Sequence, residues 1–366
     1  MEHDKIYIHW NLPRQIHRDA ARSDDFDSTV FKKSAHLQAL KDGFIENNIE
    51  PIFNFRMLYF FNFKWIYSSK YFKYFFYAYN FIFGFIDNYL LYKKILKELK
   101  NKKIKFYYTE LNPTITNSFL KSLQLNKIKS IEWFGLFPNQ LNYNTRPNKT
   151  LSNFDLIVSG EDYLPFFKTK PKKFLKIPQA VPLKRIISIK ADSVNNIDIL
   201  FIGSVSKIHS NRWDYLEYIY LNFKDCEFYG FGLEDVPDKY SFKQKFRSGL
   251  WGDEYYQKIK QAKIVLNLFQ NDYENLEDGI NIRAFEIPAC KSLQLCKKVP
   301  FIKNYFKEGH NIILFEDIDE MGKKIKYFIE NKKERDEIIE NSFNAIQEYD
   351  FSNHLKLTLK EVSLKY

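Results

Sequence analysis

One short stretch in the C-terminal half brings together side chains that could bind a phosphorylated sugar. Asn281 can cap a helix, because its side chain can accept a hydrogen bond from a free backbone N–H of the first turn. Arg283 and Glu286 follow three residues apart, which places them on one face of that helix. An arginine and the N-terminal N–H groups of a helix favour phosphate, while a carboxylate can accept hydrogen bonds from sugar hydroxyls. The stretch therefore predicts a site for a sugar phosphate.

The residues around this stretch predict how it is held in place. An apolar run over residues 264–269 is typical of a buried parallel strand, and a polar loop over residues 270–278 leads from it to the helix. Ile282, Phe285 and Ala289 recur at helical spacing, so we expect them to pack inward. The alternative interpretation is a surface helix with one ion pair between its arginine and its glutamate, and no ligand.

The same stretch resembles the group 1 glycosyltransferases of GT-B fold. Asp278 and Gly279 stand where that family has an acid and a glycine, and Glu286 stands where it has a second acid after seven intervening residues. The resemblance implies that Glu286 binds the ribose of a nucleotide-sugar and that Asp278 contacts the transferred sugar. Lys291 departs from the pattern, because the family often has a glycine there.

The helix itself is similar to the spore-maturation-protein CgeB-like branch of these enzymes. The resemblance rests on the run Asn281-x-Arg283-x-Phe285-Glu286, and the likeness continues over most of residues 174–315. It implies that Asn281 and Arg283 belong to the donor-binding residues together with the glutamate.

The start of the C-terminal half carries a second part of this resemblance. An apolar strand over residues 198–202 ends at Gly203 and Ser204, and Arg212 follows at the start of the next helix. A glycine would let the backbone approach the diphosphate, and Arg212 would neutralise the leaving nucleotide diphosphate. The alternative role for Arg212 is a surface cation at a helix start.

A strand and glycine turn over residues 226–232 also resembles the family, in which an aromatic-glycine element lies close to the donor base. The resemblance therefore implies that Tyr229 and Gly230 contact the donor. The alternative is a strand that ends in a tight turn without any ligand.

The N-terminal half predicts a Rossmann-like unit that binds the acceptor. Its order is a strand over residues 6–10, a polar loop, a helix over residues 28–47 and a strand over residues 49–55. The fingerprint G-x-G-x-x-G is absent, so we do not expect a nicotinamide or flavin cofactor. Glu110 follows a strand over residues 104–108, at the end where ligands bind in open α/β sheets, which makes it a candidate acceptor contact or a helix-capping carboxylate.

The catalytic base depends on the stereochemistry of transfer, which the pattern leaves open. An inverting enzyme needs a base from the first domain, and the candidates are His9, Asp24, Asp25 and Glu110. A retaining enzyme needs no protein base, so stabilisation of the leaving group by Arg212 and helix N-termini would carry more of the barrier. No acidic pair suited to a divalent metal stands out, and we expect a metal-independent reaction without a cofactor.

Residues 57–100 are rich in aromatic side chains and lysines. One interpretation is a buried aromatic core with lysines at its rim. The other is a surface that meets a membrane carrying a lipid-linked acceptor. The longest uncharged apolar run, residues 74–86, is shorter than the roughly 20 residues needed to span a bilayer.

Composition narrows the classes of partner and the compartment. The chain has 366 residues, 45% of them apolar, and a formal net charge of +11. The lysines are spread along the chain rather than gathered in one block, so anionic donors or lipid headgroups explain the charge as well as nucleic acid does. We expect no nucleic-acid partner, and a nucleic-acid-binding protein is an alternative that rests on charge alone. Three cysteines without a disulfide or zinc spacing, and a first strand that starts almost at the N-terminus, fit a cytoplasmic protein, with the inner face of the membrane as an alternative place.

These observations predict an α/β protein of GT-B fold, with two Rossmann-like domains facing an interdomain cleft. We expect an acceptor-side domain over residues 1–182, a nucleotide-sugar domain over residues 183–350 and a helix over residues 351–366 that crosses back to the first domain. The predicted function is sugar transfer to a glycan or lipid-linked glycan, in the synthesis of surface polysaccharide or glycoconjugate. The alternatives are a nucleotide-sugar epimerase or polyol-phosphate transferase of the same fold, and a non-catalytic nucleotide-sugar-binding module.

Overall fold

The computed structural model describes residues 4–10, 20, 25–55, 72–110, 115–134, 148–160, 170–191, 196–269 and 280–363. The chain divides into two compact units. The first comprises residues 1–179 and 351–366, and the second comprises residues 180–350. Among the described residues, no helix combines the length and the apolar character needed to cross a membrane.

The first unit is built on a six-stranded parallel sheet in the order β2-β1-β3-β4-β5-β6. The chain runs from β1 outward to β2 and then returns to the other side of β1. The sheet therefore has a topological switch point between β1 and β3, the place where ligands bind at the carboxyl ends of strands. The strands are β1 (Asp4–His9), β2 (Ile49–Asn54), β3 (Phe106–Glu110), β4 (Lys129–Trp133), β5 (Leu156–Ser159) and β6 (Phe174–Lys176).

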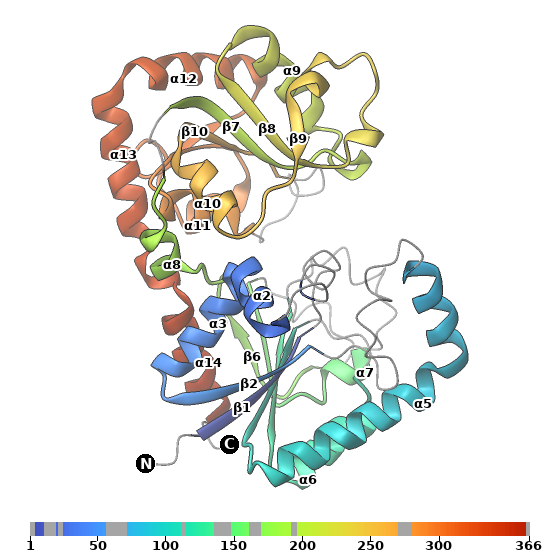
Figure 1. Ribbon diagram of the computed structural model, residues 1–366. Coiled ribbons are helices and arrows are strands. Elements are labelled where there is room, and N and C mark those ends of the chain that lie inside the picture. Colours follow the sequence, from blue (N-terminus) through green and yellow to red (C-terminus); the bar gives the residue numbers. More distant parts are fainter. Residues whose placement is uncertain are drawn as a thin grey trace. The chain divides into compact units, whose positions relative to one another are not determined.

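The helix predicted over residues 28–47 is two helices, because the backbone at Ser34 is extended and its hydroxyl caps the second helix through Leu37 N–H. The C-terminal helix packs on that second helix (Figure 1), where Asn47 donates a hydrogen bond to the Ser352 carbonyl. The chain end thus returns to the first unit, as predicted. The helices of this unit are α2 (Phe26–Lys33), α3 (Ala35–Glu46), α5 (Phe72–Asn101), α6 (Asn117–Leu125), α7 (Asn148–Leu151) and α14 (Phe351–Ser363).

The second unit is a six-stranded parallel sheet in the order β12-β11-β10-β7-β8-β9. Its switch point lies between β7 and β10, since the chain first grows from β7 towards β9 and then crosses to β10. The short strand β9 was not predicted from the sequence. The strands are β7 (Ile197–Ser204), β8 (Cys226–Phe231), β9 (Phe246–Ser248), β10 (Ala262–Asn267), β11 (Leu293–Lys297) and β12 (Ile313–Phe315).

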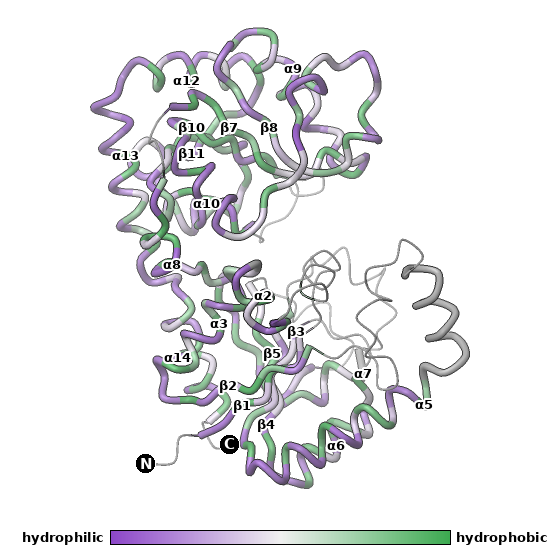
Figure 2. Tube along the Cα trace, in the orientation of Figure 1, coloured by the Kyte–Doolittle hydropathy of each residue, from purple (hydrophilic) through white to green (hydrophobic). Residues whose placement is uncertain are grey.

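The core of the second unit lies between the sheet and its helices. Phe201, Phe228 and Phe315 are fully buried there, and Figure 2 shows hydrophobic residues along the central strands and hydrophilic ones on the outer helices α12 and α13. The apolar strand runs are therefore covered by helices, as a parallel sheet requires. The α-helices are α8 (Leu183–Ser188), α9 (Arg212–Asn222), α10 (Asp253–Lys260), α11 (Arg283–Ala289), α12 (Ile318–Glu330) and α13 (Lys332–Ala345).

Candidate functional site

Helix α11 starts beside the carboxyl end of β10, and Asn281 fixes this arrangement. Its Oδ1 accepts a hydrogen bond from Ala284 N–H at 3.1 Å, so it satisfies a first-turn donor as the sequence predicts. Its Nδ2 donates to Oδ1 of Asn267, the last residue of β10, at 3.0 Å. The asparagine pair holds the helix N-terminus at the switch point.

Glu286 is buried, with 7% of its surface exposed, and its carboxylate is held by two phenols of α10. Tyr255 donates to Oε2 at 2.7 Å and Tyr256 donates to Oε1 at 2.9 Å. Burial raises the pKa of Glu286, while the two hydrogen bonds and the charge of Arg283 act in the opposite direction. Helix α11 is not a surface helix, because its residues 284–289 are all buried, and a carboxylate buried in this way needs the polar partners that it has.

Arg283 is half-buried on the first turn of α11, and its Nε is enclosed without a hydrogen-bond partner. Its positive charge acts against the rise in the pKa of Glu286 that burial causes, and it contributes to the lowered pKa of His209. Within the described residues it forms no ion pair with Glu286. A buried cationic donor of this kind gains free energy when a ligand supplies an acceptor.

Arg212 is buried and connects the ends of two strands. Its Nη1 donates to the Ser204 carbonyl of β7 at 2.7 Å, and its Nη2 donates to the Leu268 carbonyl just after β10 at 2.8 Å. A Cβ on Gly203 would lie 2.9 Å from the ring of Phe201 and 3.3 Å from Nη1. Gly203 therefore leaves room for the guanidinium, and Arg212 holds together the ends of β7 and β10 at the switch point.

His209 follows β7 in the loop before α9, and it was not among the residues selected from the sequence. Burial and the charges of Arg212 and Arg283 lower its pKa to about 4, so the imidazole is neutral at neutral pH. Its Nδ1 is enclosed without a hydrogen-bond partner. In the same loop the hydroxyls of Ser204 and Ser206 lie 2.9 Å apart. The place of His209 directly after a strand that ends at the switch point was the available signal.

Tyr229 is buried and belongs to a charged network that joins Glu227 of its own strand, Arg247 of β9 and Lys258 of α10. Its hydroxyl donates to Glu227 at 2.7 Å and accepts from Arg247 at 2.9 Å, and Lys258 lies 3.2 Å from the same glutamate. Burial, together with the hydrogen bond to Glu227, raises the pKa of Tyr229. The side chain expected near the donor base is therefore buried and already bonded.

Gly230 has a positive φ of 154°, and a Cβ there would lie 1.7 Å from the Gly203 carbonyl oxygen. The glycine is required for β8 to approach β7, since no side chain fits between the two backbones.

Two aromatic rings lie at the carboxyl ends of β8 and β9 and were not selected from the sequence. Phe231 is 50% exposed and Trp251 is 44% exposed, and their ring centroids are 5.5 Å apart. Gly249 supports the arrangement, because a Cβ there would lie 2.0 Å from the Phe231 ring. Large exposed rings at this edge provide apolar ring faces on which a planar base could stack.

At the carboxyl end of the first sheet, four neighbouring strands align a row of polar residues. The register pairs Asn54 with His9, His9 with Thr109, and Thr109 with Glu132. His9 is 1% exposed, and its Nδ1 lies 2.8 Å from the hydroxyl of Tyr107. Glu132 is fully buried, and a carboxylate inside an apolar strand was the sequence signal for it.

Glu110 ends β3 at the same edge. Burial and the nearby Glu132 raise the pKa of Glu110 to about 8, the range in which a carboxylate can act as a base near neutral pH. Asp25 instead caps α2 by accepting from Ser28 N–H. Asp278 and Asp24 lie outside the described residues.

Residues 192–358 match the family model described as glycosyl transferase-like. This match supports the resemblance to glycosyltransferases over most of the second unit and the start of α14, while the CgeB-like branch stays an expectation. A comparison with curated proteins gives no match.

Solved structures show the fold of the whole chain. An α-glucosyltransferase in complex with UDP-glucose and DNA containing an abasic site is 13% identical, with a TM-score of 0.62, over 98% of this chain and 99% of that one. The sucrose-phosphate synthase of Thermosynechococcus elongatus is 11% identical, with a TM-score of 0.57, over 98% of this chain and 99% of that one. A glycosyltransferase from Rickettsia africae is 10% identical, with a TM-score of 0.57, over 99% of this chain and 98% of that one. The GT-B fold predicted from the sequence is confirmed.

Proposed function

We propose that the protein is a glycosyltransferase that moves a sugar from a nucleotide-sugar to a glycan or a lipid-linked glycan, in the synthesis of surface polysaccharide or glycoconjugate. The observation that carries the proposal is the buried carboxylate of Glu286. Two tyrosine hydroxyls fix it at the switch point, beside the cationic side chain of Arg283. An oriented acceptor next to a cation suits the ribose and the diphosphate of an activated sugar.

In this proposal each part of the donor has its own contacts. Glu286 accepts hydrogen bonds from the ribose hydroxyls, and Arg283 and the neutral His209 donate to the diphosphate. Asp278 contacts the transferred sugar, an assignment that rests on the resemblance alone. The base stacks on the ring of Phe231, in place of the Tyr229 contact first expected, because the Tyr229 side chain is enclosed.

During transfer the bond between the anomeric carbon and the phosphate oxygen breaks, and an acceptor hydroxyl oxygen bonds to that carbon. The nucleoside diphosphate leaves with the electron pair, and Arg283 and the field of Arg212 stabilise the developing charge. If transfer inverts the anomeric centre, the ionised form of Glu110 takes the acceptor proton, because a pKa of about 8 makes this carboxylate more basic than an ordinary one. If transfer retains the anomeric centre, the proton passes to the departing phosphate oxygen.

Metal independence remains a prediction of this account. The described residues contain no group of three His, Cys, Asp or Glu side chains that could hold an ion. Activity that is lost with a chelator and returns with a divalent cation would contradict the prediction.

A donor screen tests the proposed activity. Purified protein is incubated with a panel of nucleotide-sugars, with and without a glycan or polyprenyl-phosphate-linked acceptor, and release of nucleoside diphosphate is measured. We expect acceptor-dependent release with one donor class, which Glu286→Ala abolishes and the exposed control Glu316→Ala retains. If the donor is converted in the absence of an acceptor and no nucleotide is released, the protein is an epimerase instead. Absence of turnover together with retained nucleotide binding would indicate a non-catalytic module.

A further inference from the structure

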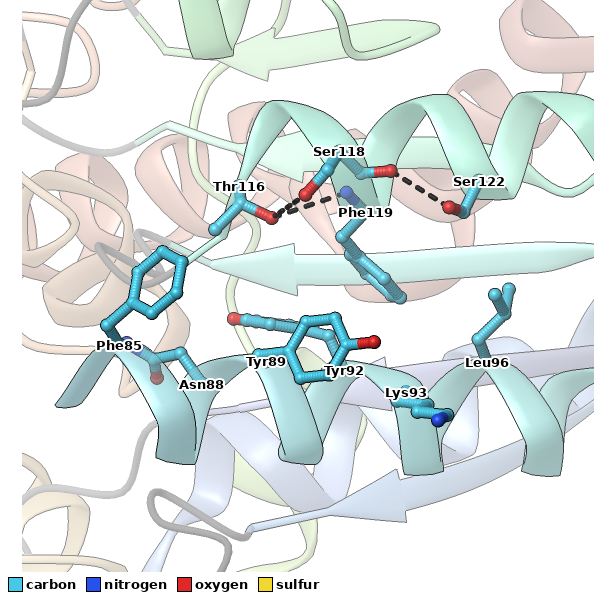
Figure 3. Close-up of a pocket in the computed structure, with 10 residues that line it drawn as sticks. All are labelled: Phe85, Asn88, Tyr89, Tyr92, Lys93, Leu96, Thr116, Ser118, Phe119 and Ser122. Atoms are coloured by element: carbon cyan, nitrogen blue, oxygen red, sulfur yellow. Dashed lines mark hydrogen bonds between the residues drawn. The ribbon is translucent and has the colours of Figure 1, made fainter. Parts of the chain in front are cut away.

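A pocket of about 330 Å³ lies in the first unit between α5 and α6. Figure 3 shows the rings of Tyr89 and Tyr92 rising from α5 and the ring of Phe119 descending from α6, with Phe85 at one end and Leu96 at the other. The volume is in the range of small-molecule sites. None of the donor-site residues belongs to it.

The three hydroxyl side chains that Thr116, Ser118 and Ser122 add to the wall are already used within α6 and its N-terminal cap. Thr116 Oγ1 accepts from Phe119 N–H at 3.3 Å and lies 3.0 Å from the Ser118 hydroxyl. The hydroxyl of Ser122 donates to the Ser118 carbonyl at 2.9 Å. The dashed lines in Figure 3 mark these three interactions. Because these three hydroxyls are engaged, and because the rest of the wall is aromatic or aliphatic apart from Asn88, Lys93 and the tyrosine hydroxyls, the pocket suits a hydrocarbon ligand better than a sugar, which needs many donors and acceptors.

The mouth of the pocket exposes large apolar side chains. Phe85 is 88% exposed, Ile86 is 55% exposed and Tyr89 is 61% exposed. Three neighbouring side chains of this size on one helix face form a patch of the kind that marks an interaction site.

The same face of α5 becomes cationic towards its C-terminal end. Lys93, Lys97 and Lys100 follow Tyr89 at spacings of three and four residues, and all three are exposed. The acids of this stretch do not offset them, since Asp87 is fully buried and Glu98 bonds Tyr7 and Lys102. The face therefore changes from apolar at Phe85 to positive at Lys100 over about 22 Å, given the rise of 1.5 Å per helical residue.

We propose that this pocket holds the hydrocarbon chain of an anionic lipid, whose phosphate lies against the lysines of α5. The chain fits the apolar wall, and the phosphate complements the charge beside it. The inference goes beyond the proposed function, because lipid binding requires no donor. If the function is also as proposed, the lipid is the carrier of the acceptor. Tyr92 supports that link, because its ring contacts both Phe119 of the pocket and His9 at the switch point.

Titration of the full chain with farnesyl monophosphate tests the inference, with farnesol and inorganic phosphate as separate probes. Ser122→Phe should fill the pocket and abolish binding of both farnesyl compounds. The double variant Lys93→Ala/Lys97→Ala should bind farnesyl monophosphate about tenfold or more weakly than wild type does. Its affinity for farnesol should be unchanged. Lys129→Ala, an exposed lysine at the amino end of β4, is the matched control and should bind as wild type does. Thermal unfolding of each variant checks that it folds.

Several results would overturn the inference. Unchanged binding by Ser122→Phe would remove the pocket from the account, and equal binding of inorganic phosphate would indicate a plain anion site. Self-association that Ser122→Phe abolishes would assign the pocket to a second copy of the chain. Binding of duplex DNA that the lysine variant loses, without lipid binding, would assign the face to nucleic acid.

Co-sedimentation with phosphatidylcholine vesicles only when they contain phosphatidylglycerol would support the inference. The experiments contain no nucleotide, so their failure is separate from a failure of the donor site.

Discussion

The hydroxyl of Tyr255 donates to Oε2 of Glu286 over 2.7 Å. The two residues come from the helices that precede and follow β10 in the sequence, so the contact joins α10 directly to α11. Together with Tyr256 it fixes both oxygens of the carboxylate in one orientation. A carboxylate held in this way is ready to accept from a ligand without reordering.

Removal of the Tyr255 hydroxyl tests this positioning. Tyr255→Phe should weaken donor binding and lower the free energy of unfolding by about 1–3 kcal/mol, since a hydrogen bond to a charged, buried group is lost. Tyr220→Phe is the matched control, because its hydroxyl bonds only the exposed Gln244 among the contacts observed. Urea unfolding and nucleotide titration measure the two effects. Equal donor affinity in both variants would contradict the positioning role.

Substitution of Arg212 should mainly lower stability, whereas substitution of Arg283 should mainly weaken donor binding. Arg212→Ala leaves the buried carbonyl of Leu268 and the partly buried carbonyl of Ser204 without the donor that Arg212 supplies, and should lower the free energy of unfolding by about 2–5 kcal/mol. Arg283→Ala should leave the unfolding midpoint nearly unchanged and weaken donor binding about tenfold or more. The reverse pattern, with Arg283 needed for stability and Arg212 only for binding, would show that their roles have been exchanged.

Much of the fold could be predicted because buried parallel strands are apolar runs, and such runs marked most strands of both sheets. The break at Ser34 was missed, because the apolar spacing continues across it and only the capping hydrogen bond reveals the extended residue. Strand β9 was missed because it has only three residues, a half-buried Phe246 and two exposed residues, which are too few to carry a periodic signal. Order within a sheet is a long-range property that local pattern does not encode.

The candidate site was predictable only in part, for a similar reason. The spacing of Asn281, Arg283 and Glu286 identified the helix start, since these contacts are local. The tyrosines that hold the carboxylate lie 30 and 31 residues earlier, and only the packing of α10 against the sheet brings them near. Residues with no matching sequence motif, such as His209, were therefore overlooked.

Gly230 should tolerate no side chain. Gly230→Ala would place a methyl group 1.7 Å from the Gly203 carbonyl oxygen, so β7 and β8 must separate, and we expect insoluble or unfolded protein. Gly309→Ala is the matched control, because Gly309 also has a positive φ of 73° but a methyl group there would have no atom within 4 Å. That variant should lose only about 1 kcal/mol from backbone strain. Circular dichroism and soluble yield compare the two, and a folded Gly230→Ala protein would refute the close approach.

Stability should fall in acid because of the buried His354. Burial and the nearby His36 lower its pKa to about 3, so the folded chain keeps it neutral while the unfolded chain protonates it near its ordinary value of 6.5. Its contribution is therefore fully present above pH 6.5 and is lost as the pH falls towards 3, by up to about 1.4 kcal/mol per pH unit. His354→Phe should flatten this dependence, whereas the exposed His310→Phe should not. Parallel unfolding curves for wild type and His354→Phe at all pH values would contradict this assignment.

The central claim is that the carboxylate of Glu286 binds the ribose of a nucleotide. Calorimetric titration with UDP, the nucleotide present in a structural neighbour, and with the other common nucleoside diphosphates compares wild type with Glu286→Gln, which keeps the shape of the side chain and removes its charge. The account predicts that one nucleotide binds the wild type and that the variant binds it at least about tenfold more weakly, with an unchanged fold. Equal affinity of the two proteins for that nucleotide would contradict the claim.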